Sequence, residues 1–207
     1  MNSDVRTILT IGHSTHSYAE FLQLLRDARV TAVADVRSSP FSRHQPHFNK
    51  EELRKKLRSV KIDYAFLGDE LGGRPKSDGL FCEGIADYEK MALTTEFERG
   101  LQRVIRGSAN YRVALMCSEH DPLDCHRCLL VGRALGRRGF DVSHILFNGN
   151  QKTQTEIEAE LLRALKQPKP DFFPEEQMAS AYRDRAMKVA FSKVERPLPD
   201  PTAVPTE

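Results

Sequence analysis

The segment at 116–127, Met-Cys-Ser-Glu-His-Asp-Pro-Leu-Asp-Cys-His-Arg, concentrates the side chains in this chain that could do chemistry. Cys117 follows an apolar run that is typical of a buried strand, and Cys125 begins a stretch with a helical pattern. A helix N-terminus has free backbone N–H groups and the positive end of the helix dipole, which bind anions and lower the pKa of a nearby thiol. We therefore predict the functional centre here, with Cys125 at the helix start and Cys117 facing it.

The charged residues of the segment indicate other chemistry as well. Glu119, Asp121 and Asp124 would raise the pKa of a thiol and repel phosphate, so the loop is not a simple anion cradle. Carboxylates beside a histidine could transfer protons or bind polar groups of a ligand. We assign Cys117, Glu119 and His126 as candidate catalytic residues. The alternatives are an inert buried thiol, a solvated loop acid and a surface histidine.

A zinc site is a further alternative, because Cys125-x-x-Cys128 has a zinc-like spacing. Zinc ribbons and fingers normally place such a pair on a turn, with a second well-spaced pair elsewhere. Here the pair starts a helix, and only Cys82 is left over after Cys117. We assign no metal and no cofactor to the site.

Two other segments could bind a ligand. The loop at 37–48 combines arginines, serines, histidines and aromatic residues, a mixture that suits a phosphate beside a stacked base. Gly12-His13-Ser14 follows an earlier strand-like run. The alternative is a solvated loop anchored by Phe41 and Phe48. The candidate ligand-binding residues are His13, Ser14, Arg37, Ser42, Arg43 and Arg127.

Alternating strand and helix patterns must position these residues. Short apolar or β-branched runs predict strands at 7–12, 31–36, 62–67, 111–116 and 142–147. Helical patterns are present at 17–28, 49–60, 86–105, with a break near 93–95, and 125–138, with Asp124 as the N-cap. Parallel neighbours need crossover helices, so we predict an α/β fold with three layers: a mostly parallel five-stranded sheet and helices on both faces. Ligands bind beyond the carboxyl ends of such strands.

The remaining segments predict a single domain over 1–195. Residues 68–84, with several glycines, are expected to form a long irregular connection. A C-terminal extension at about 150–195 contains helical patterns at 152–165 and 175–192, which we expect to pack on the domain. Residues 196–207 are expected to form a flexible, proline-rich tail.

Composition excludes some classes of protein. The formal net charge is +2, from 31 basic and 29 acidic residues, which gives no overall bias toward nucleic acid or an anionic membrane. No secretion signal or membrane-spanning run is evident, so we expect no membrane partner. The four cysteines are irregularly spaced, which favours free thiols in a reducing compartment and predicts a cytoplasmic location.

Four motifs in this order resemble the domain-of-unknown-function 488 family over about 7–147. They are Thr10-Ile11-Gly12-His13-Ser14, Asp35-Val36-Arg37 with Pro40 and Ser42, Leu71-Gly72-Gly73, and Met116-Cys117-Ser118-Glu119 with Cys125-His126-Arg127. The resemblance implies an α/β fold and a site built from these motifs, but no activity. A weaker similarity to rhodanese-like sulfurtransferases rests on Asp35-x-Arg37 and Cys117, although the loop after Cys117 is longer and acidic.

Three hypotheses of function follow. The first is an enzyme or binding protein for a nucleotide, a nucleobase or a similar small polar or anionic ligand, with Cys117 as nucleophile or pocket wall. The second is a nucleic-acid-binding or regulatory module that uses the basic loop and the arginines Arg133, Arg137 and Arg138. The third is sulfur transfer or redox exchange at Cys117 and Cys125. The sequence leaves the oligomeric state open.

Overall fold

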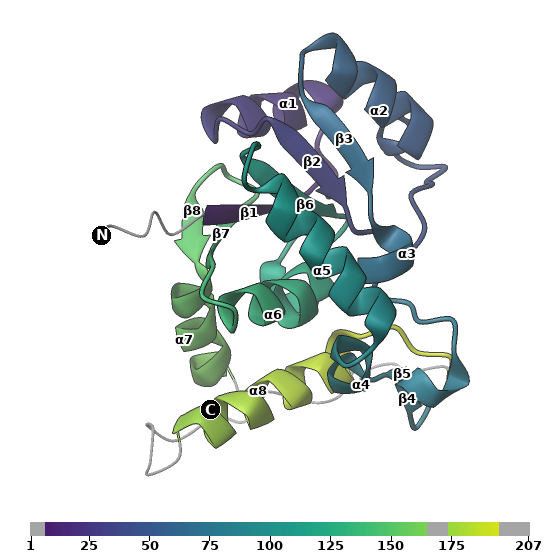
Figure 1. Cartoon of the computed structure of the whole chain (residues 1–207), viewed down its shortest axis with the longest axis vertical. Coiled ribbons are helices and arrows are strands. Elements are labelled where there is room, and N and C mark those ends of the chain that lie inside the picture. The colour runs from purple at the N-terminus through teal and green to yellow at the C-terminus, as the bar shows by residue number, and fades with distance from the viewer. Residues whose placement is uncertain (1–6, 165–173, 195–207) are drawn as a thin grey trace, which may run out of the picture.

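A six-stranded sheet forms the centre of the protein in the computed structural model, which describes residues 7–164 and 174–194 (Figure 1). Its strand order is β3-β2-β6-β1-β7-β8. The strands are β1 (Thr7–Gly12), β2 (Ala32–Asp35), β3 (Asp63–Phe66), β6 (Val113–Cys117), β7 (Asp141–Ile145) and β8 (Gln151–Thr153). All neighbours pair in parallel except β8, which is antiparallel to β7. The predicted α/β class with a mostly parallel sheet is confirmed.

The sixth strand corrects the predicted five-stranded sheet and the helix predicted from Lys152. Lys152 lies in β8, opposite His144 of β7, and the helix α7 (Gln154–Ala164) starts after this strand. The turn between β7 and β8 is tight: Gly149 has a φ of 87°, and the Asn150 N–H donates to Asn148 Oδ1 at 3.1 Å. A three-residue strand is too short to show an alternating pattern, so the sequence pattern did not separate it from the helix that follows.

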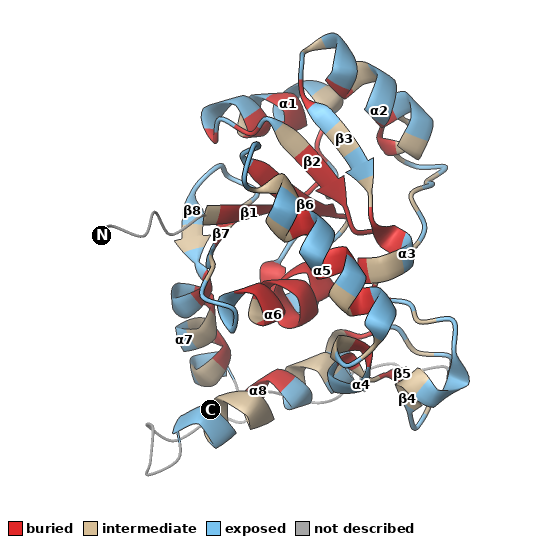
Figure 2. Cartoon of the chain, in the orientation of Figure 1, coloured by how far each residue is buried: buried red, intermediate tan, exposed pale blue. Residues whose placement is uncertain are grey.

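Helices cover both faces of the sheet, as predicted (Figure 2). Successive residues of a strand point to opposite faces, so Ile8 and Leu9 belong to two separate hydrophobic cores. The core around Leu9 packs against α1 (Tyr18–Asp27) and α2 (Lys50–Ser59). The core around Ile8 is covered by α4 (Tyr88–Ala92), α5 (Thr95–Gly107), α6 (Arg133–Gly136), α7 and α8 (Pro174–Val189).

The segment predicted as an irregular connection contains short regular elements. The segment begins with the helix α3 (Gly68–Leu71). At its end lies a two-stranded hairpin of β4 (Phe81–Cys82) and β5 (Ile85–Ala86). The chain after α8 lies beside this hairpin, since the Ala86 N–H donates to the Phe191 carbonyl at 2.8 Å. The end of α8 is thereby held near the carboxyl edge of the main sheet.

Two other predictions for the chain can be compared with the structure. The break predicted near 93–95 is confirmed, because Thr94 caps α5 with its side chain. The predicted tail at 196–207 lies outside the described residues. Within 7–164 and 174–194, no helix has both the length and the apolar character needed to cross a membrane.

Candidate functional site

A pocket of about 470 Å³ opens at the carboxyl ends of β2 and β6, the edge where parallel sheets bind ligands. Its floor contains both Cys117, the last residue of β6, and Cys125. Residues from the loops after β2 and β6, the chain after α3 and the end of α8 form its walls. These walls include Arg37, Ser38, Ser39, Gly73, Arg74, Ser118, Glu119, Asp124, Lys188, Val189 and Phe191.

Cys125, and not Asp124, caps the helix at the site. The backbone of Cys125 is extended, its carbonyl accepts the N–H groups of Cys128 and Leu129, and its Sγ accepts the Arg127 N–H at 3.5 Å. Asp124 ends the short 3₁₀ turn η3 (Pro122–Asp124), and its carboxylate pairs with Arg185 of α8. The prediction of Asp124 as the N-cap is therefore wrong, because α8 holds this carboxylate.

The turn that follows Cys125 is π-helical, over η4 (Arg127–Gly132), before the chain continues as α6. Wider π-helical turns are rare and often occur at functional sites. The start of this helix brings Cys125 and His126 to the pocket beside Cys117, while the next residue, Arg127, is fully buried. The sequence pattern does not distinguish a π-helical turn from an ordinary helix, so this arrangement could not be predicted from the sequence.

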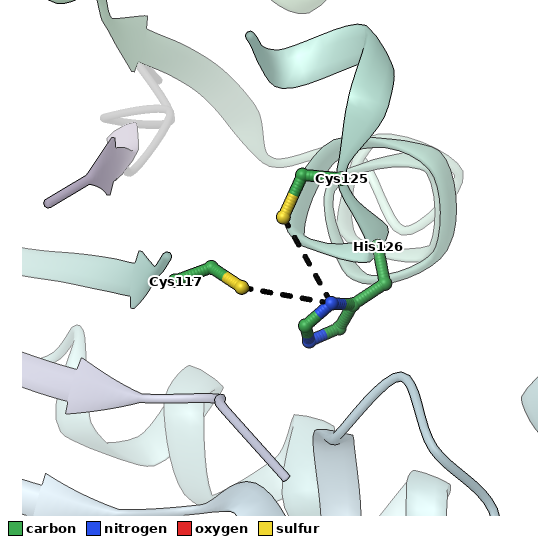
Figure 3. A group of neighbouring side chains, drawn as sticks. All are labelled: Cys117, Cys125 and His126. Carbon is green, nitrogen blue, oxygen red and sulfur yellow. Dashed lines mark hydrogen bonds between the residues drawn. The ribbon is translucent and has the colours of Figure 1, made fainter. Parts of the chain in front are cut away.

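One ring nitrogen of His126 contacts both thiols, as Figure 3 shows. Its Nδ1 is 3.7 Å from Cys117 Sγ and 3.8 Å from Cys125 Sγ. Its Nε2 is 2.9 Å from the Val36 carbonyl oxygen, which only accepts, so Nε2 carries a proton. Nδ1 is therefore the ring atom that can hydrogen-bond to the thiols, as acceptor in the neutral ring or as donor in the imidazolium.

Arg127 supplies a buried positive charge behind the thiols. Its side chain has no exposed surface, and its Nη atoms donate to the carbonyls of Glu119 and His120 at 2.7 and 3.1 Å. Neutral carbonyls do not balance the charge, and no carboxylate of the described residues forms an ion pair with it. A buried charge is stable only when it is compensated. The Cys125 sulfur, as a thiolate, is the anion best placed to do so.

The two thiols consequently differ in acidity. Burial alone raises the pKa of Cys125, but its hydrogen bond with Cys117 and the charges of Arg127 and His126 outweigh burial and hold this pKa well below its usual value. The hydrogen bond to Cys125, together with burial, raises the pKa of Cys117 well above the usual value. The charge of Cys125 in turn outweighs burial and raises the pKa of His126. The favoured state is a Cys125 thiolate beside a protonated Cys117.

The same side chains could hold a metal ion, since the ligand atoms of Cys117, Cys125 and His126 lie within 4.8 Å of one another. Formal charge does not distinguish the two states: a Cys125 thiolate with the His126 imidazolium and Arg127 carries one net positive charge, and so does a divalent cation with two thiolates, a neutral imidazole and Arg127. The assignment of no metal stays a prediction.

Arg37 is held rigidly in the wall of the pocket. It forms a bidentate ion pair with Asp35, with Nε–Oδ1 at 2.9 Å and Nη2–Oδ2 at 2.6 Å, and it donates to the Phe48 carbonyl at 2.8 Å. Its Nη1 donates to His13 Nε2 at 3.2 Å. Of the five guanidinium N–H groups, these contacts leave one on Nη1 for a ligand. Tyr64 adds a hydrogen bond to Asp35 at 2.6 Å.

His13 supports Arg37 and does not line the pocket. Because its Nε2 accepts from Arg37, its proton is on Nδ1, which donates to the Ser14 carbonyl at 3.0 Å. The ring also stacks on Phe48, with 4.2 Å between ring centroids. Burial, followed by the charge of Arg37, lowers the pKa of His13 to about 4. A neutral His13 is thus built into the fold.

Acidification should destabilise the protein through His13 and through His144, whose pKa burial also lowers to about 4. Both folded-state values lie below the ordinary 6.5, so the stabilisation is present above pH 6.5 and is lost as the pH falls toward 4. At pH 5 each histidine should cost about 2 kcal/mol of unfolding free energy. Urea unfolding at pH 7 and pH 5 measures this loss.

In this experiment, His13→Gln and His144→Gln should each reduce the difference in unfolding free energy between the two pH values, whatever their stability at pH 7. The exposed His44 provides the control, and His44→Gln should leave the difference unchanged. An unaltered pH dependence in both buried-site variants would contradict the prediction.

Of the remaining predicted residues, some lie at the pocket and others lie away from it. Glu119 is on the pocket rim, where burial and then the charge of Cys125 raise its pKa. Ser14, with a φ of 43°, contacts the site through its backbone, donating to the Ser118 carbonyl. Ser42 Oγ accepts from backbone N–H groups of its own loop, and Arg43 is exposed away from the pocket lining. Their roles in binding stay predictions.

The nucleic-acid hypothesis gains no support from the arrangement of its basic residues. Arg133 is within ion-pair distance of Glu89, at 3.7 Å, and Arg138 pairs with Glu98 at 2.5 Å. Acidic partners thus reduce the positive field of this helix. Binding of nucleic acid stays a prediction from the sequence.

Three residues of the pocket wall, from the chain after residue 70, could not be predicted from the sequence. Arg74 stacks on Phe191, with its guanidinium carbon 5.0 Å from the ring centroid, and both lie in the pocket wall beside Lys188. The extension at 150–195 was expected only to pack on the domain. The spacing of Lys188 and Phe191 gave no sign that they approach Cys125, because that depends on the path of α8.

Two glycines allow the backbone to approach the site closely. A Cβ on Gly12 would lie 1.9 Å from the Glu119 carbonyl oxygen, and one on Gly73 would lie 2.8 Å from the ring of His126. We expect Gly12→Ala to displace the loop after β6 and to cost about 1–3 kcal/mol of unfolding free energy. Chemical denaturation measures the cost.

Gly136 in α6 provides a matched control, since a Cβ there meets nothing within 4 Å. Gly136→Ala should leave the unfolding free energy unchanged or raise it by about 0.5–1 kcal/mol, because alanine favours the helix. Equal effects of the two alanine substitutions would argue against close packing at Gly12.

The parallel sheet and the pocket at its carboxyl edge define an α/β protein with a candidate ligand site that has two thiols at its floor. The chain belongs to the family described as "Domain of unknown function DUF488", whose model matches residues 17–134. This confirms the family that the motifs predicted. The match includes Cys117, Cys125 and His126 and excludes His13 and α8. No curated protein matches the chain, and no finding supports the weaker similarity to rhodanese-like sulfurtransferases.

Proposed function

We propose that this protein is a thiol-dependent enzyme in which the Cys125 thiolate attacks an electrophilic centre of a small anionic molecule. One observation carries the proposal: Cys125 Sγ lies at a pocket floor, accepts the Arg127 N–H, and faces both His126 and the buried Arg127 charge. Thiolates stabilised by a helix start and by cations are typical of reactive cysteines. This assigns the nucleophile to Cys125 and not to Cys117, the candidate favoured by the sequence.

The walls of the pocket support an anionic ligand. Arg74 and Lys188 contribute positive charge on the outer side, and Arg37 has one N–H group without a protein acceptor. Guanidinium groups bind carboxylate and phosphate groups with directed hydrogen bonds. A volume of about 470 Å³ suits a metabolite and not a folded partner.

The acidic and imidazole groups suit proton transfer after the attack. His126 contacts both sulfurs and can return a proton to Cys125 when the product leaves. Glu119, with its raised pKa, lies at the rim where a leaving group would accept a proton. Glu119→Gln should therefore slow turnover without slowing the first attack.

A pair of alkylating agents of similar size tests the nucleophile and the anion site together. Iodoacetate carries a carboxylate and iodoacetamide is neutral. Relative to free cysteine, the protein should favour iodoacetate, and mass spectrometry should locate the product on Cys125. Arg74→Gln should reduce the iodoacetate rate severalfold and leave the iodoacetamide rate unchanged, because only the anion uses this guanidinium.

All measurements should use a Cys82→Ser background, since Cys82 is exposed and would add its own reaction. Cys128 should stay silent, because burial raises its pKa to about 12. Arg43→Gln is the control for loss of positive charge outside the pocket. A Cys125 that reacts no faster than free cysteine with either reagent would refute the proposed function. Equal effects of Arg74→Gln on both reagents would refute the anion site.

A further inference from the structure

The pocket floor contains a second thiol that the attack by Cys125 does not use. Cys117 is buried at the end of β6, and its sulfur lies within 4.8 Å of Cys125 Sγ, with His126 Nδ1 in reach of both. Both sulfurs face the same pocket. A structural cysteine needs no such neighbour, and Cys128 shows the contrast, since its Sγ lies against Gln154 in the core.

We propose that the substrate is a disulfide of a small anionic thiol and that Cys117 is the resolving thiol of the reaction. The inference rests on the proposed function, because it takes Cys125 as the attacking group. What it adds is the class of electrophile and a catalytic role for Cys117. The argument is geometric: a sulfur electrophile on Cys125 would lie within reach of the Cys117 sulfur, and the described cysteines Cys82 and Cys128 do not line the pocket.

The two steps balance in atoms and electrons. The Cys125 thiolate attacks one sulfur of the substrate R–S–S–R; the substrate S–S bond breaks and a mixed disulfide Cys125–S–S–R forms. The leaving sulfur takes the Nδ1 proton of the His126 imidazolium and departs as RSH, which leaves His126 neutral. Cys117 then loses its proton to His126 and attacks Cys125 Sγ. The mixed disulfide breaks, the second RS⁻ takes the proton from His126, and a Cys117–Cys125 disulfide remains. The substrate is reduced by two electrons, and the protein dithiol is oxidised by two.

The asymmetry of the two thiols matches this order of events. The cations Arg127 and His126 stabilise the charge on Cys125, so it attacks first, while Cys117 stays protonated until the first step removes the negative charge beside it. After that step the proton on Cys117 can move to His126 Nδ1, 3.7 Å away. Two equivalents of a small monothiol such as glutathione, or one of a dithiol such as dithiothreitol, would then regenerate the reduced pair by the same exchange.

The test uses dithiodipropionate, a small disulfide with a carboxylate at each end, and the full chain with Cys82→Ser. The protein should release about two equivalents of mercaptopropionate and lose the mass of two hydrogen atoms, with peptide mapping showing a Cys117–Cys125 bond. With Cys117→Ser added, it should release about one equivalent and keep the mixed disulfide on Cys125. Near-ultraviolet circular dichroism and thermal unfolding show whether each variant is folded.

The outcomes separate this inference from the proposed function. A mixed disulfide that stays on Cys125 in the protein with Cys117 intact would overturn the resolving role, while Cys125 would still be the nucleophile. If dithiodipropionate leaves both thiols unchanged although iodoacetate alkylates Cys125, the substrate class is wrong. If neither reagent reacts at Cys125, the proposed function itself fails. Should Cys117→Ser misfold, Cys117→Ala is the second variant, with the same expected retention of the adduct.

Discussion

Cys125→Ser is expected to abolish the rapid alkylation of the protein by iodoacetamide at pH 6. A free cysteine is almost fully protonated at this pH, whereas the site stabilises the Cys125 thiolate through the hydrogen bond with Cys117 and the charges of Arg127 and His126. Thiolates of low pKa are intrinsically weaker nucleophiles, which offsets part of the gain. The protein with Cys82→Ser should therefore react on the order of tenfold to a hundredfold faster than free cysteine. Its rate should change little between pH 6 and pH 8.

The measurement is the rate of mass increase on intact protein, followed across this pH range. Cys117→Ser should keep a fast reaction, since the serine hydroxyl can still donate a hydrogen bond to the Cys125 thiolate and Arg127 and His126 still provide the charges. His126→Gln should slow the reaction at pH 6 and restore a rise in rate with pH. Fast alkylation that persists in Cys125→Ser, or one that disappears only in Cys117→Ser, would show that the thiolate is Cys117.

Asp35→Asn should produce the largest loss of stability, about 3–5 kcal/mol of unfolding free energy. The Asp35 carboxylate has no exposed surface and accepts four hydrogen bonds: two from the Arg37 side chain, one from the Arg37 N–H and one from Tyr64. Removing its charge leaves Arg37 buried without an anion. An asparagine of nearly the same size isolates this effect from a cavity.

Chemical denaturation at pH 7 measures the loss, and Asp69→Asn provides the matched control. Asp69 pairs with Lys76 at 3.1 Å, but both side chains are largely exposed, so its substitution should change stability little. Arg37→Gln should cost nearly as much as Asp35→Asn, and the double variant should cost less than the sum. Additive costs would show that the two side chains act independently and would contradict the role of the pair.

The fold was predictable where a pattern extends over a whole element. Ile8 and Leu9 begin alternating core positions in β1, and the Ser17 cap of α1 is present with both of its hydrogen bonds. The order of strands and helices therefore followed from sequence. Strand β8 did not, because three polar edge residues have neither the length nor the alternation of a strand. Its evidence is tertiary: the backbone pairs with β7.

The location of the candidate site was predictable, but the roles within it were not. Cys117, His126 and Arg37 are brought to one pocket, as expected from the carboxyl ends of parallel strands. Which sulfur bears charge depends on where the Arg127 guanidinium is buried and on the N-cap conformation of Cys125. Neither the burial of Arg127 nor the backbone conformation of Cys125 can be inferred from the spacing of residues along the chain. Side-chain directions are likewise not encoded in the spacing, which is why His13 was expected in the pocket and instead accepts a hydrogen bond from Arg37.

Helix α8 and the chain after it bring residues from outside the family match to the pocket. The thiols and the imidazole lie inside the range that the family model matches, whereas Lys188 and Phe191 come from beyond it. The floor of the pocket thus lies within the family match, whereas part of the outer wall, beside Arg74, comes from the C-terminal segment. A different C-terminal segment on the same floor would change the outer wall and leave the thiols in place. Exchanging this segment is accordingly a direct route to altered selectivity.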